Sequence, residues 1–528
     1  MACAGCRTCR TGGGESYAGR PVMAAANAVD RFGAVACGHP VTAAAAAEVL
    51  KDGGTAFDAV VAAQCAACVC EPILASLAGG GFLLARPASG DPVVYDFFVQ
   101  TPLARQAPDA LDFYDVEVDF GGVRQEFHIG VGAAATPGYV RGLFDIHADL
   151  CRLPLARLMQ PAIDAARTGV RVTPLQAYML DTVAPICCAN EDVRGVYAGG
   201  GRRPLGEGDL LRQPELADSF EALRDEGAEV FYAGEMAASL VELCRAEGQI
   251  RPGDLASYRT IRRKPLVVRY RGAEIATNPL PSTGGLLVAL TLGLLEDTEP
   301  ETETQRIANL ADAMRLTNQA RLESGTMAEF DADLVRRYQD AMHGRAQARR
   351  GTTHISVADC EGNVAAMTVS NGEGCGRFIP GTGIALNNML GEEDINPGGF
   401  HSWVPGTRLA SMMAPTLVET ADQQLVVGTG GSNRIRSAIV QAIDHLVRAG
   451  WSAEAAVTAP RLHVEGDLLN LEGGFSRDTE AVLESAFDDV EHWGRTNLFF
   501  GGVHIAGERE GRFVAVGDPR RGGTGRVV

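Results

Sequence analysis

The hydrophobic positions in the first half of the chain recur mainly at helical spacing. Apolar residues three and four positions apart form one face of a helix, and a glycine just beyond that pattern is a common stop signal. The spacing predicts helices over Val41–Lys51, Ala56–Cys70, Leu155–Thr168 and Pro214–Glu226, of which the last two end at Gly169 and Gly227. Strands are predicted after the glycine run 79–81 and over Val267–Ile275, which leads into the turn-rich segment 278–285.

The second half of the chain alternates apolar and polar positions more often, which is typical of strands. Ile355–Asp359 and Val364–Ser370, joined by a turn at 360–363, predict a hairpin. Further strands are expected at Ile384–Asn387, Leu425–Gly428 and Phe513–Gly517, and helices at Gln305–Ala320 and Ile435–Ala449. The acidic segment 296–304 is expected to be a solvated loop. No internal repeat occurs, so the pattern indicates an α+β protein with helices outside and sheets inside.

Composition and charge exclude several classes of partner. The 528 residues carry a formal charge of −19, which disfavours nucleic acid and anionic membranes as partners. No run reaches the ~18 apolar residues of a membrane span, and residues 1–20 lack the apolar core of a secretory signal. We therefore expect a cytoplasmic protein whose first 20 residues form a flexible lead-in.

The cysteines and histidines do not predict a metal or another cofactor. Cys65, Cys68 and Cys70 fall in a run rich in alanine and valine, where they are expected to be small buried hydrophobic residues in a reducing compartment. Cys3, Cys6 and Cys9 have metal-like spacing, but no fourth ligand follows nearby. The ten histidines show no pairing at helical spacing. Walker A, G-x-S-x-G and H-E-x-x-H motifs are absent from the sequence.

One junction in the chain suits a threonine nucleophile. A threonine hydroxyl needs a nearby base, and the α-amino group of an N-terminal threonine, with a pKa of ~7.7–8.0, can supply one. The polar, basic segment 343–351 ends at Gly351 and is followed directly by Thr352 and the predicted hairpin. Cleavage between Gly351 and Thr352 would expose such an amine. A Gly-Thr pair alone is common and would not establish this chemistry.

Motifs along most of the chain strengthen this interpretation. They are 53–54 (GG), 79–82 (GGGF), 136–138 (TPG), 281–285 (PSTGG), 352–359 (TTHISVAD), 361–363 (EGN), 380–388 (PGTGIALNN), 409–412 (LASM), 430–432 (GGS), 459–461 (APR) and 517–520 (GDPR). In this order they resemble the γ-glutamyltranspeptidase family, over residues of about 30 to 521.

The resemblance implies a four-layer αββα sandwich of the N-terminal nucleophile (Ntn) hydrolase type, cut autocatalytically into a large subunit, 21–351, and a small subunit, 352–528. It implies that Thr352 is the nucleophile, that its amine is the base, and that Gly430 and Gly431 bind the oxyanion. Two successive amides without a Cβ suit that role chemically. Ser370 falls where the family has a hydroxyl that supports the nucleophile.

The resemblance also implies a substrate site, and there the chain departs from the family. Asn388, Glu392 and Ser411 match positions that bind substrate, but Phe98 stands where the family has an arginine for the substrate carboxylate, and Met389 replaces an amide or acidic residue. Phenylalanine cannot replace a bidentate arginine–carboxylate contact.

Three functions remain open. The first is an amidohydrolase or acyltransferase that cleaves a small amide other than an ordinary γ-glutamyl peptide, with water or an amine as acceptor. The second is a true γ-glutamyltransferase or glutathione hydrolase in which Arg105, Arg377 or Arg408 replaces the missing arginine. The third is an unprocessed binding protein, which the intact Gly-Thr junction and the glycine pair disfavour.

Overall fold

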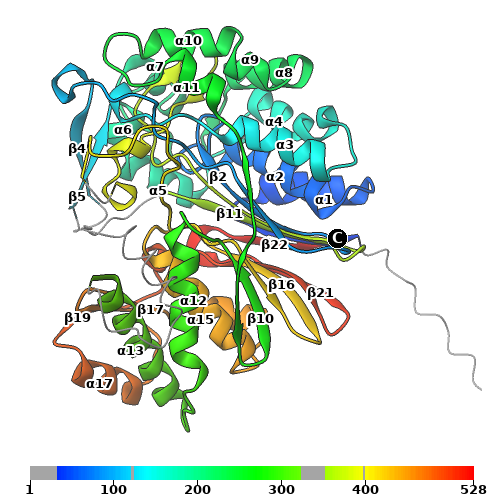
Figure 1. The fold of residues 1–528 in the computed structure, drawn as a ribbon, viewed down its shortest axis with the longest axis vertical. Coiled ribbons are helices and arrows are strands. Elements are labelled where there is room, and N and C mark those ends of the chain that lie inside the picture. The colour runs from blue at the N-terminus through cyan, green and yellow to red at the C-terminus, as the bar shows by residue number, and fades with distance from the viewer. Residues whose placement is uncertain (1–31, 120–123, 323–350, 397–398) are drawn as a thin grey trace, which may run out of the picture. The chain divides into compact units, whose positions relative to one another are not determined.

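Two antiparallel sheets form the centre of the computed structural model, which describes residues 32–119, 124–322, 351–396 and 399–528 (Figure 1). The seven-stranded sheet has the order β22 (Thr524–Val527), β1 (Gly33–Cys37), β11 (Thr353–Asp359), β12 (Val364–Ser370), β2 (Gly80–Arg86), β3 (Val93–Asp96) and β8 (Ile261–Arg263). The six-stranded sheet has the order β21 (Arg512–Val516), β20 (His504–Arg509), β16 (Gln423–Gly428), β15 (Thr416–Glu419), β10 (Ala273–Thr277) and β9 (Leu266–Tyr270).

Strands β11 and β12 are the predicted hairpin, and every residue in both is buried. Their register pairs Ile355 with Met367 and Val357 with Ala365. One face of these strands packs against helices and the other against the second sheet, so apolar and small side chains are required on both faces.

Helices cover the outer face of each sheet. On the seven-stranded sheet lie α1 (Pro40–Lys51), α2 (Ala56–Cys70) and α3 (Tyr139–Leu150), with α4 (Leu155–Thr168) and α8 (Pro214–Glu226) stacked outside them. On the six-stranded sheet lie α12 (Thr283–Glu296), α15 (Arg434–Val447) and α16 (Ala453–Thr458), followed by α13 (Glu303–Leu322) and α17 (Arg477–Ala486). The predicted αββα sandwich is therefore confirmed.

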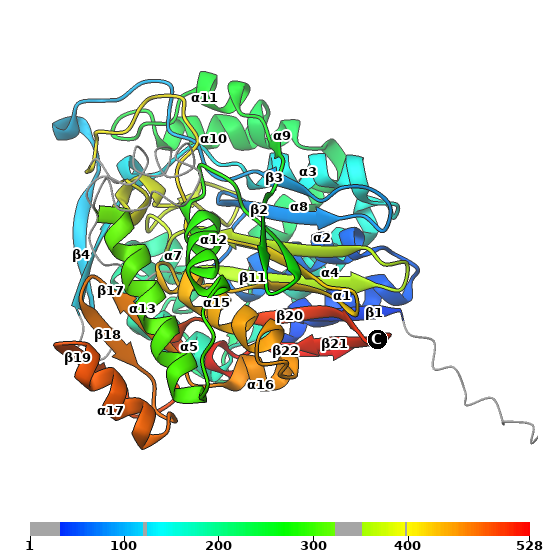
Figure 2. The same cartoon turned by 60° about the horizontal axis from the view of Figure 1, so that its bottom comes forward.

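Smaller elements decorate the sandwich. Figure 2 shows α13 and α17 beside the small sheet of β17 (Leu462–Glu465), β18 (Leu468–Leu471) and β19 (Asp489–His492). Short paired strands are β4 (Tyr114–Asp119) with β5 (Arg124–Ile129), β6 (Val170–Arg171) with β7 (Leu210–Leu211), and β13 (Phe378–Ile379) with β14 (Ile384–Ala385). Short helices are α5 (Pro174–Thr182), α6 (Ala184–Cys187), α7 (Glu191–Tyr197), α9 (Glu229–Tyr232), α10 (Glu235–Leu243) and α11 (Pro252–Ser257).

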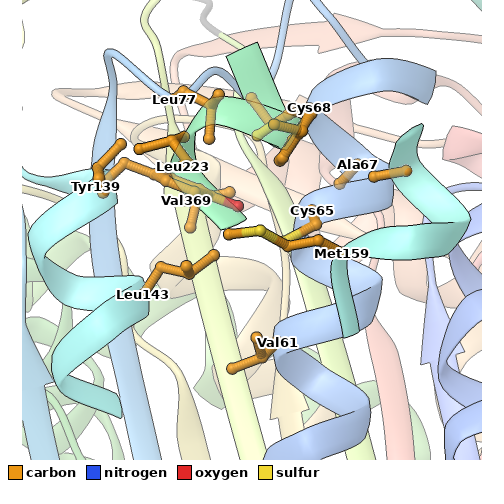
Figure 3. Packing of buried hydrophobic residues seen from close by; sticks show 14 of the residues in the cluster. Val61, Cys65, Ala67, Cys68, Leu77, Tyr139, Leu143, Met159, Leu223 and Val369 are labelled. Atoms are coloured by element: carbon orange, nitrogen blue, oxygen red, sulfur yellow. The ribbon is translucent and has the colours of Figure 1, made fainter. Parts of the chain in front are cut away.

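The cysteines of helix α2 lie inside the first hydrophobic cluster. Figure 3 shows Cys65 and Cys68 among Tyr139, Met159 and Val369. Burial raises the pKa of the Cys65 thiol well above its ordinary value, so this side chain is a neutral packing group. The expectation of small buried hydrophobic residues is confirmed for these two cysteines.

Two expectations about the middle of the chain are wrong. Segment 267–275 is not one strand, because Arg271 and Gly272, both at positive φ, turn the chain between β9 and β10. The glycines of segment 278–285 do not prolong a turn, because α12 begins at Thr283. Gly284 is needed for close packing, since a Cβ there would lie 2.0 Å from the carbonyl oxygen of Met412.

Several expectations fall outside the described residues: the lead-in 1–20 with Cys3, Cys6 and Cys9, and segment 343–350 before Gly351. No helix in the described ranges is long and apolar enough to cross a membrane.

Candidate active site

The predicted catalytic residues meet at one edge of the two sheets. Thr353 begins β11, Ser370 ends β12 and Gly80 begins β2, so antiparallel pairing places all three at the same edge of the first sheet. In the second sheet, β16 ends at Gly428, two residues before Gly430. A Cβ on Gly430 would lie 1.9 Å from the carbonyl oxygen of Thr352. The ends of both sheets thus converge on Thr352.

The Gly351–Thr352 junction is held from both sides. Ser370 Oγ donates to the carbonyl oxygen of Gly351 at 2.7 Å, and the N–H of Gly351 donates to Glu373 Oε1 at 2.7 Å. Thr352 is only 6 % exposed. The hydroxyl of Ser370 therefore polarises the carbonyl whose bond to Thr352 was predicted to break, while Glu373 fixes the orientation of the same residue.

Gly430 and Gly431 form a tight backbone turn beside the junction. Gly431 has a φ of +129°, which L-residues with side chains rarely adopt. Thr429 holds the turn, because its hydroxyl donates to the Gly430 carbonyl at 2.7 Å and accepts the N–H of Gly502 at 2.8 Å. The structure brings the glycine pair to Thr352; its oxyanion role stays a prediction.

A buried histidine links the sheets behind the junction. The ring nitrogens of His354 lie 2.7 Å from Thr368 Oγ1 and 2.9 Å from Ser356 Oγ. Ser356 in turn donates to the carbonyls of Val426 and His504, both at 3.1 Å. Burial lowers the pKa of His354 well below its ordinary value, so the ring is neutral and positions the strands.

Sequence reasoning missed Glu71, a buried acid next to the junction. Its Oε2 accepts the hydroxyl of Thr353 at 2.7 Å and its Oε1 accepts that of Thr42 at 3.3 Å. Burial raises the pKa of Glu71 to about 7, although both hydroxyl hydrogen bonds act in the opposite direction. A lone acid directly after an apolar helix was the available signal, since charged residues are seldom buried without a reason.

A cavity of about 480 Å³ opens beside Thr352. The residues that line it include Gly351, Thr352, Thr353 and Gly430. Its apolar wall includes Ile73, Leu74, Leu175, Met179, Trp493 and Phe499, and its charged groups include Glu71, Glu373, Arg434 and Arg521. This volume lies within the range of small-molecule sites.

None of the five predicted substrate residues is among the described residues that border this cavity. Asn388 and Glu392 meet on the Gly372 side of the junction, because a Cβ on Gly372 would lie 2.0 Å from Asn388 Oδ1 and 2.4 Å from Glu392 Oε1. Phe98 and Met389 are buried in the core, and the ring of Phe98 stacks on Phe82 at 5.6 Å.

The hydroxyl of Ser411 is used locally, where it accepts the N–H of Met413 at 3.1 Å. The substrate roles of all five residues stay predictions.

The three arginines considered as replacements have other partners. Arg408 contacts Asp96 at 3.4 Å and donates to the Phe98 carbonyl and the Tyr258 hydroxyl. Arg377 lies 3.6 Å from Asp112, and Arg105 donates to the carbonyl of His401 at 2.9 Å. None of them borders the cavity beside Thr352 as the described residues define it.

Within the described part of the chain, no group of three or more histidine, cysteine or acidic residues is arranged to hold a metal ion.

Comparisons with known proteins agree with this geometry. The family model described as Gamma-glutamyltranspeptidase matches residues 42–528. The acylase ACY 1 proenzyme of Pseudomonas sp. strain V22 is 32 % identical, over 86 % of this chain and 85 % of the relative. The glutathione hydrolase proenzyme of Escherichia coli K12 is 30 % identical, over 90 % and 88 %.

Among solved structures, the cephalosporin acylase from Bacillus halodurans matches with a TM-score of 0.80 and 23 % identity, covering 97 % of this chain and 98 % of that one. This likeness shows the αββα fold. The family match and the matches to the two proenzymes cover most of the chain. The chain belongs to the γ-glutamyltranspeptidase family of Ntn hydrolases, a family of hydrolase and transferase enzymes.

Proposed function

We propose that the chain is a proenzyme that cuts itself between Gly351 and Thr352 and then cleaves amide bonds with Thr352 as nucleophile. The observation that carries the proposal is that Ser370 and Glu373 both form hydrogen bonds with Gly351, next to a buried Thr352. The large subunit would be 21–351 and the small subunit 352–528. Water or an amine would be the acceptor.

In the self-cleavage step, Thr352 Oγ attacks the carbonyl carbon of Gly351. The C–N bond to Thr352 breaks, an ester to Oγ forms, and the hydroxyl proton passes to the Thr352 nitrogen. Water then hydrolyses the ester, which leaves a Gly351 carboxylate and a free Thr352 amine. The hydrogen bond from Ser370 supports this step, because it strengthens as negative charge develops on the Gly351 oxygen.

In the amide-cleaving step, the Thr352 amine removes the proton from its own hydroxyl as that hydroxyl attacks the substrate carbonyl. The amides at Gly430 and Gly431 would bind the resulting oxyanion. The proton then passes to the departing amine, and the acyl group stays on Thr352 as an ester until water or another amine takes it. No cofactor takes part in these steps.

The expected substrate is a small acyl amide other than a simple γ-glutamyl peptide. Phe98 supports this, since it offers no charge to an α-carboxylate and its ring is committed to the core. Glutathione hydrolysis is the second candidate, because Asn388 and Glu392 still meet beside Gly372, where a substrate ammonium could bind. A cytoplasmic location is consistent with the described cysteines, all of which are free thiols.

The first experiment tests maturation. Intact mass and N-terminal sequencing of purified protein should show a chain that begins Thr-Thr-His-Ile. Thr352→Ala should stay uncut and inactive, whereas Thr352→Ser should cut slowly. An active wild-type protein that remains a single polypeptide would disprove the proposal.

The second experiment compares γ-glutamyl-4-nitroanilide with its des-carboxy analogue, 4-aminobutyryl-4-nitroanilide. We expect the γ-glutamyl compound to have no advantage in kcat/KM, and mass spectrometry to detect an acyl-enzyme on the small subunit. An advantage of tenfold or more for the γ-glutamyl compound would favour the glutathione-type enzyme instead.

A further inference from the structure

Arg521 borders the cavity beside Thr352, and among the described residues it lacks the carboxylate partners that Arg461 and Arg520 have. The side chain of Arg521 passes over Gly502, where a Cβ would lie 2.6 Å from the Cβ of Arg521. Its guanidinium reaches the glycine pair: Nη1 is 3.3 Å from a Cβ placed on Gly430, and Nη2 is 3.4 Å from one placed on Gly431. Arg521 therefore lies next to the groups expected to handle the reacting carbonyl.

Among the described residues, no carboxylate lies within ion-pair distance of Arg521. Its Nη2 donates to the carbonyl oxygen of Leu498 at 3.3 Å, and its buried Nε has no hydrogen-bond partner in that set. Desolvation lowers the pKa of Arg521 to about 10, so the side chain still carries its charge at neutral pH. A desolvated cation without an anion is unfavourable, which makes this site suited to an anionic ligand.

The neighbouring arginines show the contrast. Arg461 pairs with Asp518 at 2.6 Å, and Arg520 pairs with Glu472 at 2.5 Å. Asp518 is thus already engaged by Arg461, and its second oxygen lies 3.3 Å from Arg520. Arg520 also borders the cavity, but its charge is paired with Glu472 and Asp518, whereas the Arg521 guanidinium has no such carboxylate among the described residues.

The rest of the cavity suits an apolar body. Leu175 and Met179 of α5 face the same space as Trp493, Leu498 and Phe499. Arg434 adds positive charge on the Phe499 side, where its guanidinium lies 4.9 Å from the ring centroid. A volume of about 480 Å³ exceeds the needs of a water molecule or a small amine.

We propose that Arg521 binds a carboxylate on the leaving amine of the substrate, so that the amide cleaved joins an acyl group to an apolar amino acid or a similar carboxylated amine. The inference rests on the proposed function, and it adds that the acyl group lies on the side of the junction where Asn388 and Glu392 meet beside Gly372. Those residues do not border this cavity as described, so the cavity receives the other half of the amide.

The test uses two amines of the same shape and different charge, 4-aminobenzoate and 4-aminobenzamide. Calorimetry and quenching of tryptophan fluorescence measure their binding to purified wild-type protein, whether it is isolated cut or uncut. We expect the benzoate to bind about tenfold more tightly or better, as one charge-assisted pair contributes. Arg521→Gln should reduce this preference to near one, and Arg521→Lys should restore part of it. Arg512→Gln, a change at an exposed arginine of β21, should leave the preference unchanged.

A further variant locates the site. Leu175→Trp should weaken both amines together, because the larger ring fills the cavity. Equal binding of the two amines to wild type, or a preference that survives Arg521→Gln, would overturn the inference. Neither readout depends on Thr352 chemistry. A failure of self-cleavage or of acyl-enzyme formation is therefore recorded separately and counts against the proposed function alone.

Discussion

At the scale of single residues, Ser370 has a more specific position than sequence reasoning assigned to it. Its hydroxyl donates to the carbonyl oxygen of Gly351. The carbon of that carbonyl forms the peptide bond to Thr352 that is proposed to break. Ser370→Ala should therefore slow maturation about a hundredfold, as loss of one oxyanion donor does in other enzymes. Ser370→Thr, which keeps the hydroxyl, should mature within about tenfold of wild type. Intact mass recorded over time measures both, and an alanine variant that matures at the wild-type rate would contradict the assignment.

Glu71 gives the site a dependence on pH. Its pKa in the folded protein is about 7, above the ordinary value of 4.5, so the folded state retains this proton at pH values where the unfolded chain has lost it. The free energy of unfolding should therefore fall as pH rises from 4.5 to 7, by at most about 3 kcal/mol from this residue.

Glu71→Gln, which is neutral throughout, should remove that part of the decrease. Urea midpoints at pH 4.5 and 7.5 measure it in both proteins. The idea fails if the two proteins lose the same stability between these pH values.

At the scale of elements, the glycine turn after β16 is closely fitted to the start of β11. Gly430→Ala would place a Cβ 1.9 Å from the Thr352 carbonyl oxygen, so the turn has to move. We expect a loss of about 2 kcal/mol or more in stability, together with loss of maturation. Gly195→Ala in α7 is the matched control: its Cβ would meet nothing within 4 Å, and alanine favours a helix. Urea unfolding and intact mass distinguish the two, and equal behaviour would show that the close approach is unimportant.

The sequence was sufficient to predict the bounds of elements whose ends carry local capping signals. Helices α2, α4 and α8 have the predicted bounds, because Thr55 forms a capping box and Gly169 and Gly227 end their helices at positive φ. It was insufficient where a glycine serves tertiary packing, as Gly284 does against Met412. The motif residues Gly351, Thr352, Ser370 and the glycine pair could be predicted together. The position of Glu71 and Arg521 beside Thr352 could not be predicted, because only the folded sheets bring these residues together.

At the scale of the whole molecule, both sheets combine strands from before and after the Gly351–Thr352 junction. In the first sheet β11 lies between β1 and β12, and β12 pairs with β2. In the second sheet β15 pairs with β10. After cleavage the two chains should therefore co-elute in native size-exclusion chromatography and separate only in denaturant. Separation in native buffer would mean that the hydrogen bonds between these paired strands do not hold the subunits together.

The pairing of β1 with β22 has a consequence for gene design. Val528 donates its N–H to the carbonyl of Gly33 at 2.9 Å and accepts the N–H of Phe32 at 2.6 Å, so the first and last described residues are adjacent. A circularly permuted gene that encodes 352–528, a short linker and then 32–351 would leave both sheets intact. Removal of the initiator methionine from this permutant should leave Thr352 as the N-terminal residue, with a free amine. Its activity would then no longer require self-cleavage between Gly351 and Thr352, so the residues needed for maturation could be distinguished from those needed for turnover.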